Sequence, residues 1–340
     1  MKVVTGTGET IGGAAAVVYL ARQVWWTWPL WAISRIPLMM PELDRGYRWM
    51  VARRYCLQGG CTLPLHDLGE TGDWVPMIGG LAVVLATGKF LPAWVWMWSL
   101  VGTLYFGFKW ITWIRARRGG LRMSLGRGVG YWLLWPGMSP KALARPKRHA
   151  RPTEWATAVA NIAFGAALVW WVARRVPADE ELLAGWVGWI GLAFILHFGL
   201  MHLAALAWGT EPNMQAPIRA ESLREFWGTR WNRAFRDLAR GLWFEPIRRR
   251  WGTDVATLGV FLFSGLLHEL VISVPAGTGV GLPTLFFGLQ GIGMLIESHW
   301  RTGRWRLLTW IIVVGPAFWL FHPAFIERVV VPMMKAWRAL

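Results

Sequence analysis

The chain has 340 residues, of which 55% are hydrophobic, and its mean hydropathy is +0.35. A soluble domain of this length needs a polar exterior, so the composition indicates an integral membrane protein surrounded by membrane lipids. The net charge of +17 does not indicate a nucleic-acid partner, because Lys and Arg fall in blocks between apolar runs, as the positive-inside rule describes.

Residues 1–70 lack an apolar run of the roughly 20 residues that a membrane span requires. Residues 14–20 are apolar, but Arg22 and Gln23 interrupt the run before residues 25–31. We predict an N-terminal cytoplasmic segment of short amphipathic helices. Its two cysteines, Cys56 and Cys61, have the spacing of neither a Cys-x-x-Cys redox pair nor a zinc site.

Seven apolar segments follow, and each is predicted to cross a membrane as a helix. They cover residues 74–91, 93–114, 154–172, 182–208, 255–275, 280–297 and 305–325. The predicted fold of residues 71–340 is an all-α polytopic membrane domain with seven or eight transmembrane helices. Residues 131–138 are apolar but too short to cross, so we expect a re-entrant or interfacial segment there. Lys89 and Lys109 lie near predicted helix ends, where a lysine can snorkel to the headgroups.

The basic loops assign the two sides of the membrane. If the N-terminal segment is cytoplasmic, the Lys- and Arg-rich loops 115–153, 209–254 and 298–304 are cytoplasmic as well. The basic tail does not fit this alternation, so the last span is either re-entrant or followed by an eighth half-helix. We expect the location to be a bacterial inner (cytoplasmic) membrane.

The fifth apolar segment carries two ionisable residues, His268 and Glu269, in its middle. Ionisable groups cost several kcal/mol in such a place unless they are paired or face a wet cavity, so they indicate function. A neutral imidazole is the form that a general base requires. A structural histidine bonded to a neighbouring helix is the alternative.

The loop that precedes this segment predicts a helix from about residue 222 to 238. Ser222 and Glu225 match a capping box. Apolar side chains such as Phe226 and Trp227 recur on one face, and arginines lie mostly elsewhere. We expect an interfacial helix with its apolar side in lipid and its arginines toward anionic headgroups, although this leaves Asn232 unexplained.

Together these segments resemble a known family. Phe226-Trp227-x-x-Arg230-Trp231-Asn232, followed by Ser264-Gly265-x-x-His268-Glu269, is similar to the signature of the wax synthase branch of the membrane-bound O-acyltransferase (MBOAT) family. Pro283-Thr284-x-Phe286-Phe287-x-x-Gln290-Gly291 resembles the apolar segment that follows in that branch. The resemblance covers about residues 74–340.

The resemblance implies a helical membrane enzyme with a buried reaction chamber. His268 matches the catalytic histidine of the family, Asn232 its second polar residue, and Glu269 a position that orients or assists the histidine. The expected substrate-binding residues are Trp227, Arg230, Trp231, Ser264 and Gln290. No metal site or cofactor is expected, and acyl-CoA is a substrate.

These observations predict transfer of a fatty acyl group from a thioester to the hydroxyl of a lipophilic alcohol. Acyl-CoA is the preferred donor, acyl carrier protein remains a second one, and the sequence does not select the alcohol. A non-catalytic membrane lipid-binding or transport protein is the alternative, which would not require His268.

Residues 1–70 have a weaker resemblance to the C-terminal half of the DCC family of thiol-disulfide oxidoreductases. It rests on residues 12–20 and 28–30 and on Asp44-Arg45-Gly46-Tyr47-Arg48-Trp49. The Cys-x-x-Cys of that family has no counterpart here, so the segment is interpreted as a remnant. A membrane redox partner is therefore a third and weaker hypothesis.

Overall fold

The structure is a computed structural model, and it describes residues 2–5, 8–23, 71–144, 148–299 and 306–340 and a few residues between 31 and 47. The chain divides into two compact units, Met1–Asp67 and Leu68–Leu340. Cys56 and Cys61 lie outside the described residues, and so does most of the segment that resembles the DCC family.

The N-terminal unit begins with a small β-hairpin. Strands β1 (Lys2–Val4) and β2 (Thr10–Gly12) pair in antiparallel register, with Val3 opposite Ile11. Helix α1 (Gly13–Gln23) follows directly and buries the small side chains of Ala14, Ala16 and Ala21. The expectation of helices alone is therefore wrong for residues 2–12, because strands of three residues are too short to show an alternating pattern.

The second unit is all-α throughout its described residues. Its α-helices are α4 (Val75–Thr87), α5 (Ala93–Arg118), α6 (Leu125–Val129), α7 (Pro140–Leu143), α8 (Pro152–Ala167), α9 (Glu181–Ala193), α10 (Met201–Ala207), α11 (Leu223–Glu225), α12 (Arg233–Ala239), α13 (Glu245–His268), α14 (Val274–Ala276), α15 (Leu282–His299), α16 (Arg306–Val314), α17 (Ala317–Leu320), α18 (Pro323–Phe325) and α19 (Val331–Ala336). Wider π-helical turns join several of them, at Gly130–Leu134, Leu168–Val172, Phe194–Leu200, Phe226–Arg230, Arg240–Phe244, Glu269–Ser273 and Ile326–Val330.

Three helical stretches of the described chain are long and apolar enough to cross a membrane: Pro152–Arg175, Glu181–Ala207 and Arg233–Ala276. A fourth candidate is the pair Arg306–Leu320 and Pro323–Ala336, which is bent by 55°. Length and composition identify these spans, and the predicted seven or eight are not confirmed. A bend of this kind fits either a broken span or a re-entrant loop, so a last span that is re-entrant or followed by an eighth half-helix stays a prediction.

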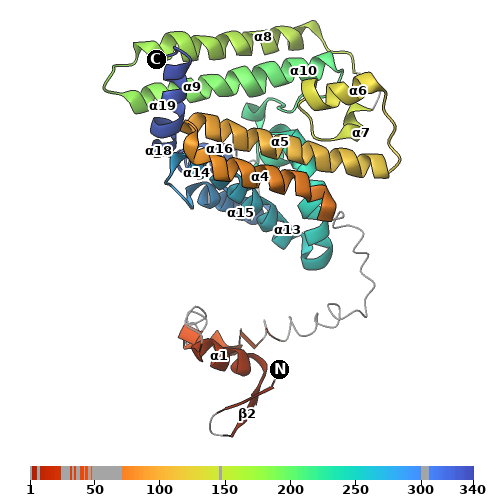
Figure 1. Cartoon of the computed structure of the whole chain (residues 1–340), viewed down its shortest axis with the longest axis vertical. Coiled ribbons are helices and arrows are strands. Elements are labelled where there is room, and N and C mark those ends of the chain that lie inside the picture. The colour runs from red at the N-terminus through yellow and green to blue at the C-terminus, as the bar shows by residue number, and fades with distance from the viewer. Residues whose placement is uncertain are drawn as a thin grey trace. The chain divides into compact units, whose positions relative to one another are not determined.

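Small residues bring the helices of this unit into close contact. Helix α8 runs beside α9 and α10 (Figure 1), and a Cβ on Gly165 would lie 2.5 Å from the carbonyl oxygen of Gly191. Helices α13 and α15 also run side by side (Figure 1). There a Cβ on Gly265 would lie 2.7 Å from the Cα of Thr284. Such contacts allow backbones to approach closely without large side chains between them.

Lys109 lies in the middle of α5 and is fully buried, so the prediction that it snorkels is wrong. Its Nζ donates to the carbonyl oxygens of Tyr131 and Trp135, the latter at 2.7 Å, and lies 4.2 Å from the centre of the Tyr131 ring. These carbonyls belong to the short apolar segment 131–138, whose π-helical turn ends at Leu134. Lys109 therefore ties that segment to α5, because it satisfies carbonyls that a terminating helix leaves without partners.

Candidate active site

His268 is the last residue of α13, and the helix widens directly after it into the π-helical turn Glu269–Ser273. Its Nδ1 lies 2.7 Å from the carbonyl oxygen of Ser264, one turn earlier. A carbonyl oxygen only accepts, so Nδ1 carries the proton and Nε2 of the neutral ring keeps its lone pair. No hydrogen bond to Nε2 is found among the described residues. The helix itself thus holds His268 in the tautomer that can remove a proton.

Ser264 contributes its backbone, and its hydroxyl donates to the carbonyl oxygen of Val260 at 2.9 Å. The side chain is buried. The predicted substrate-binding residue Ser264 is therefore placed where it positions His268, and the adjacent Gly265 permits the close approach of α15.

Glu269 is directed to the start of α15. Its Oε1 accepts from the backbone nitrogens of Gly281 and Thr284 at 2.9 and 3.0 Å and from the Thr284 hydroxyl at 2.9 Å. Its Oε2 is buried and has no hydrogen-bond partner within the described chain. The carboxylate satisfies N–H groups that the first turn of a helix leaves free, and its charge suits that end of the helix dipole. No hydrogen bond joins it to the His268 ring in the described part of the structure.

Aromatic rings connect His268 with the Phe-Trp motif. The His268 ring lies 4.5 Å from that of Phe287, and the Phe287 ring lies 5.8 Å from that of Trp227. The indole Nε1 of Trp227 donates to Oε1 of Gln290 at 3.2 Å. Gln290 is fully buried, and its Nε2 donates to the carbonyl oxygen of Ile312. The first and third motifs thus contact each other through Trp227 and Gln290, and Phe287 connects them with His268.

The motif segment is not the interfacial helix that its periodicity predicts. Ser222 does cap a helix, since its Oγ accepts from the Glu225 nitrogen at 3.0 Å. The expectation that the apolar side enters lipid is wrong, because Phe226 is only 3% exposed and Trp227 packs against Phe261 and Phe287. These side chains face the protein interior, where Trp227 contacts α13 and α15 and Phe226 contacts Trp310 of α16.

Asn232 interrupts the segment with a left-handed backbone, φ 39° and ψ 59°. Its Oδ1 accepts from the Phe235 nitrogen at 3.2 Å and caps α12. Since Oδ1 is the acceptor in this bond, the NH₂ group of Asn232 remains a donor. Asn232 makes no hydrogen bond to His268 among the described residues.

Arg230 and Trp231 are held within the protein. Arg230 binds Glu225 through Nε at 2.7 Å, and its Nη1 donates to the carbonyl oxygens of Gln215 and Ala216. Hydrogen bonds from the Glu221 nitrogen and from Arg230 hold the pKa of Glu225 below its usual range, so this carboxylate is charged at neutral pH. The Trp231 ring stacks on Phe226 with centres 5.4 Å apart. Arg230 therefore fixes the motif segment to the preceding loop.

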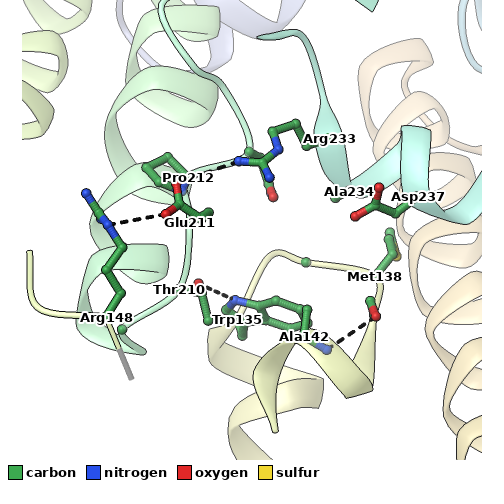
Figure 2. Close-up of a pocket in the computed structure, with 14 residues that line it drawn as sticks. Trp135, Met138, Ala142, Arg148, Thr210, Glu211, Pro212, Arg233, Ala234 and Asp237 are labelled. Carbon is green, nitrogen blue, oxygen red and sulfur yellow. Dashed lines mark hydrogen bonds and ion pairs between the residues drawn. The ribbon is translucent and has the colours of Figure 1, made fainter. Parts of the chain in front are cut away.

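A polar pocket of about 280 Å³ lies beside this segment (Figure 2). Arg148 and Arg233 approach the Glu211 carboxylate from two sides, at 3.3 and 3.7 Å, and Asp237 lies across the pocket from Arg148 (Figure 2). Trp135 forms part of the wall, and its Nε1 donates to the Thr210 hydroxyl at 2.9 Å. His268 is not among the residues that line this pocket. The pocket joins the short apolar segment 131–138, held by Lys109, to the motif loop.

Sequence reasoning missed several residues that the structure places at these sites. Thr284 and Phe287 belong to the third motif, so a signal for them was present in the sequence. Arg148 and Glu211 had no such signal, because one lies in a basic stretch and the other in a loop more than sixty residues later. Among the described residues, no group of three His, Cys, Asp or Glu side chains could hold a metal ion.

Comparison with known proteins shows what part of the chain is similar to. The model of the membrane bound O-acyl transferase family matches residues 208–289, which contain Trp227, Asn232, His268 and Glu269. The resemblance to the wax synthase branch that the motifs indicated is confirmed. The resemblance of residues 1–70 to DCC proteins is unsupported by the comparisons.

Three curated plant proteins are among the relatives. The probable long-chain-alcohol O-fatty-acyltransferase 9 of Arabidopsis thaliana is 34% identical over 144 residues, which are 36% of this chain and 42% of the relative. The long-chain-alcohol O-fatty-acyltransferase of Simmondsia chinensis is 31% identical, over 37% of this chain and 41% of the relative. The acyl-CoA–sterol O-acyltransferase 1 of Arabidopsis thaliana is 30% identical, over 34% and 39%. The chain thus spans about two fifths of the length of the curated relatives it matches.

Proposed function

We propose that this chain is a membrane O-acyltransferase that moves a fatty acyl group from a thioester, preferably acyl-CoA, to the hydroxyl of a lipophilic alcohol. The observation that carries the proposal is His268, an imidazole in an apolar helix with Nδ1 bonded to Ser264 and Nε2 free to accept. It lies inside the segment that matches the acyltransferase family, and two of the relatives are named for long-chain alcohols and one for sterols.

The proposed reaction uses His268 as a general base. Nε2 removes the proton of the alcohol as its oxygen attacks the thioester carbonyl. When the carbon–sulfur bond breaks, the leaving thiolate takes this proton from Nε2, and an ester and a free thiol result. The amide NH₂ of Asn232 is proposed to stabilise the oxyanion, and Glu269 to fix the end of the helix that carries the base.

We place the polar part of the donor in the pocket of Figure 2. Arg148 also pairs with Glu154. Glu211 is about half exposed, and its contacts to Arg148 and Arg233, at 3.3 and 3.7 Å, are longer than the 2.6 Å ion pair of Arg230 with Glu225. A phosphate group can therefore exchange with Glu211 and bind both guanidinium groups. We propose that the path between this pocket and His268 is shaped by Trp227, Arg230, Trp231 and Gln290. These residues are not proposed to bind phosphate.

We also propose that α4, α5 and α15 enter the bilayer together with the apolar stretches described above, giving seven or eight membrane segments in a bacterial inner membrane. The length of α5, 26 residues, supports this, because a helix of that length exceeds the hydrocarbon core of about 30 Å. The apolar stretch Gly72–Gly88 supports it as well.

Membranes that contain the chain test the activity directly. Labelled palmitoyl-CoA would be offered with long-chain alcohols and sterols, and wild type compared with His268→Ala at equal protein level. We expect ester formation that falls by at least about 100-fold in the variant, the loss typical of a missing general base. His299→Ala is the matched control, because His299 is exposed at the end of α15.

An equal rate in the His268→Ala variant would contradict the assignment of the base. A lipid-binding or transport protein is the second candidate, favoured by the apolar walls that the helices α13 and α15 expose. Binding of labelled lipid by wild type and His268→Ala alike, without ester from either, would support that candidate.

A further inference from the structure

An apolar groove of about 580 Å³ lies on the outer faces of α13 and α15. Its walls come from Leu262 and Leu266 of α13, Leu285, Leu289 and Ile292 of α15, and Trp319 of α17. Leu262, Leu266, Leu285 and Ile292 are among the exposed large hydrophobic side chains of the chain, Leu266 with 61% of its surface accessible. In a membrane protein such a surface faces lipid, so the groove opens toward hydrocarbon. We call it the Glu269 groove after its one charged lining residue.

The Glu269 carboxylate is only half satisfied. Oε1 accepts three hydrogen bonds from Gly281 and Thr284, both of which also line the groove. Oε2 is buried and has no partner among the described residues. A buried polar atom without a partner costs free energy that a bound donor recovers. A carboxylate only accepts, so the ligand that completes the site must bring a hydrogen-bond donor.

The charge of Glu269 selects among membrane molecules. Phosphate groups of phospholipids and of acyl-CoA carry negative charge and are repelled by a carboxylate in apolar surroundings. An acyl ester or a hydrocarbon supplies no donor for Oε2. A long apolar molecule with one hydroxyl satisfies both the groove and the carboxylate, because its chain contacts the leucines while its O–H donates to Oε2.

The position of the groove relative to the base supports the same ligand. Glu269 follows His268 directly, and adjacent helical residues point about 100° apart. On α15, Phe287 contacts the His268 ring, while its neighbour Gly288 lines the groove. A hydroxyl bound at Glu269 is therefore close to the base but on another helix face, so the groove is an entry site from which the alcohol moves to Nε2 of His268 before it reacts.

We propose that the Glu269 groove binds the lipophilic alcohol acceptor from the bilayer, with the hydroxyl of the alcohol donating to Oε2 of Glu269. This inference rests on the proposed acyltransferase function. It assigns the acceptor and the donor to different surfaces, the apolar groove for the alcohol and the polar pocket of Figure 2 for the head of the thioester.

Gly288 offers a steric test. A Cβ added at Gly288 meets no atom within 4 Å, and Gly288 lines the groove, so a larger side chain can extend from this position into the groove. We expect Gly288→Phe to raise the KM for hexadecanol by about tenfold or more, because the lost contacts are apolar. The KM for a sterol should rise by at least the same factor. The KM for palmitoyl-CoA should stay at the wild-type value. Gly79→Phe on α4 is the matched control, since Gly79 also has open space around its Cβ position and lies away from the groove.

A second measurement does not depend on ester formation. A photoreactive long-chain alcohol would be cross-linked to the full chain in membranes and the labelled peptides mapped, with hexadecanol as competitor. Labelling of peptides from residues 262–292 that Gly288→Phe reduces supports the groove, whether or not the wild type makes ester. An active enzyme whose label lies elsewhere, or whose Gly288→Phe variant keeps the wild-type KM for every alcohol, overturns the inference. If the chain forms no ester but its groove is labelled, the result counts against the proposed function and not against the groove.

Discussion

Asn232 combines two roles that one substitution can separate. Its Oδ1 caps α12 through the Phe235 nitrogen, while its NH₂ group is the donor proposed for the oxyanion. Its backbone lies in the left-handed region, which Asn and Asp tolerate better than other residues with a Cβ. Aspartate is as good an N-cap as asparagine but has no N–H to offer.

Asn232→Asp should therefore leave the fold intact and damage catalysis. We expect its kcat to fall by about 100- to 1,000-fold, the cost of one oxyanion donor, while its unfolding midpoint in detergent stays close to that of wild type. Asn232→Ala should lose activity and also about 2 kcal/mol of stability, because the cap disappears and alanine is strained at this φ. Normal turnover by Asn232→Asp would show that Asn232 acts only as a cap.

At the residue scale, the sequence singled out His268 and Glu269 but did not predict their hydrogen-bond partners. His268 and Glu269 stand out because ionisable groups in an apolar helix are costly. The partner of His268 is a backbone carbonyl, and that of Glu269 lies on the next helix, fifteen residues away at Thr284. Side-chain pattern carries no information about the first, and the second depends on how closely Gly265 lets α15 approach.

At the element scale, the close contact between α13 and α15 depends on Gly265. A Cβ at this position would lie 2.7 Å from the Cα of Thr284, which is backbone and cannot move aside cheaply. The nitrogen and the hydroxyl of Thr284 also donate hydrogen bonds to Glu269. The contact between the helices therefore determines where the start of α15 lies relative to His268.

Gly265→Ala should push the two helices apart and cost about 1–3 kcal/mol, the usual penalty of overpacking. The control is Gly102→Ala on α5, where an added Cβ meets nothing within 4 Å and alanine is the better helix former. Thermal unfolding of both variants in detergent measures the difference. A Gly265→Ala variant as stable as Gly102→Ala would mean that the helices do not meet as described.

The position of the short apolar segment 131–138 depends in the same way on Lys109. Lys109→Met keeps the apolar stem but removes the Lys109 donor from the Tyr131 carbonyl and leaves the Trp135 carbonyl with the longer bond from Tyr105 Oη, at 3.3 Å; the expected cost is about 1–3 kcal/mol. We expect a clearly lower unfolding temperature, and a higher KM for acyl-CoA because Trp135 lines the polar pocket. Lys89→Met changes an exposed lysine at the end of the neighbouring helix. It should change neither the unfolding temperature nor the KM for acyl-CoA. Equal shifts in the two variants would argue against a structural role of Lys109.

Helices were predicted well where a long apolar run decides them, as for Pro152–Arg175 and Glu181–Ala207. The prediction failed for the motif segment, where one continuous helix was expected. The Arg233 nitrogen donates to the Asn213 carbonyl, and the Gln215 nitrogen to that of Arg230. These bonds to a preceding loop separate α12 from Phe226–Arg230, and helical periodicity contains no sign of them.

At the scale of the whole molecule, the distribution of charge makes a prediction about sidedness. The stretch Pro152–Arg175 crosses from the basic loop before it to the mixed loop after it, where Asp179 and Glu180 offset Arg174 and Arg175. The positive-inside rule places the basic loop, with Arg122, in the cytoplasm and the loop around Asp179 on the other side. Both side chains are exposed, so both sites accept a reporter without disturbing the core.

Cysteine labelling tests this topology. Cys56→Ser and Cys61→Ser first remove the native thiols, a change that should leave acyl transfer intact because no redox pair is expected. Asp179→Cys should then react with a membrane-impermeant maleimide in intact cells, whereas Arg122→Cys should react only after the membrane is opened. The same loop leads to Arg148 in the polar pocket, so cytoplasmic labelling places the donor pocket on the side where acyl-CoA is made. Labelling of Arg122→Cys in intact cells would invert the topology and exclude acyl-CoA from that pocket.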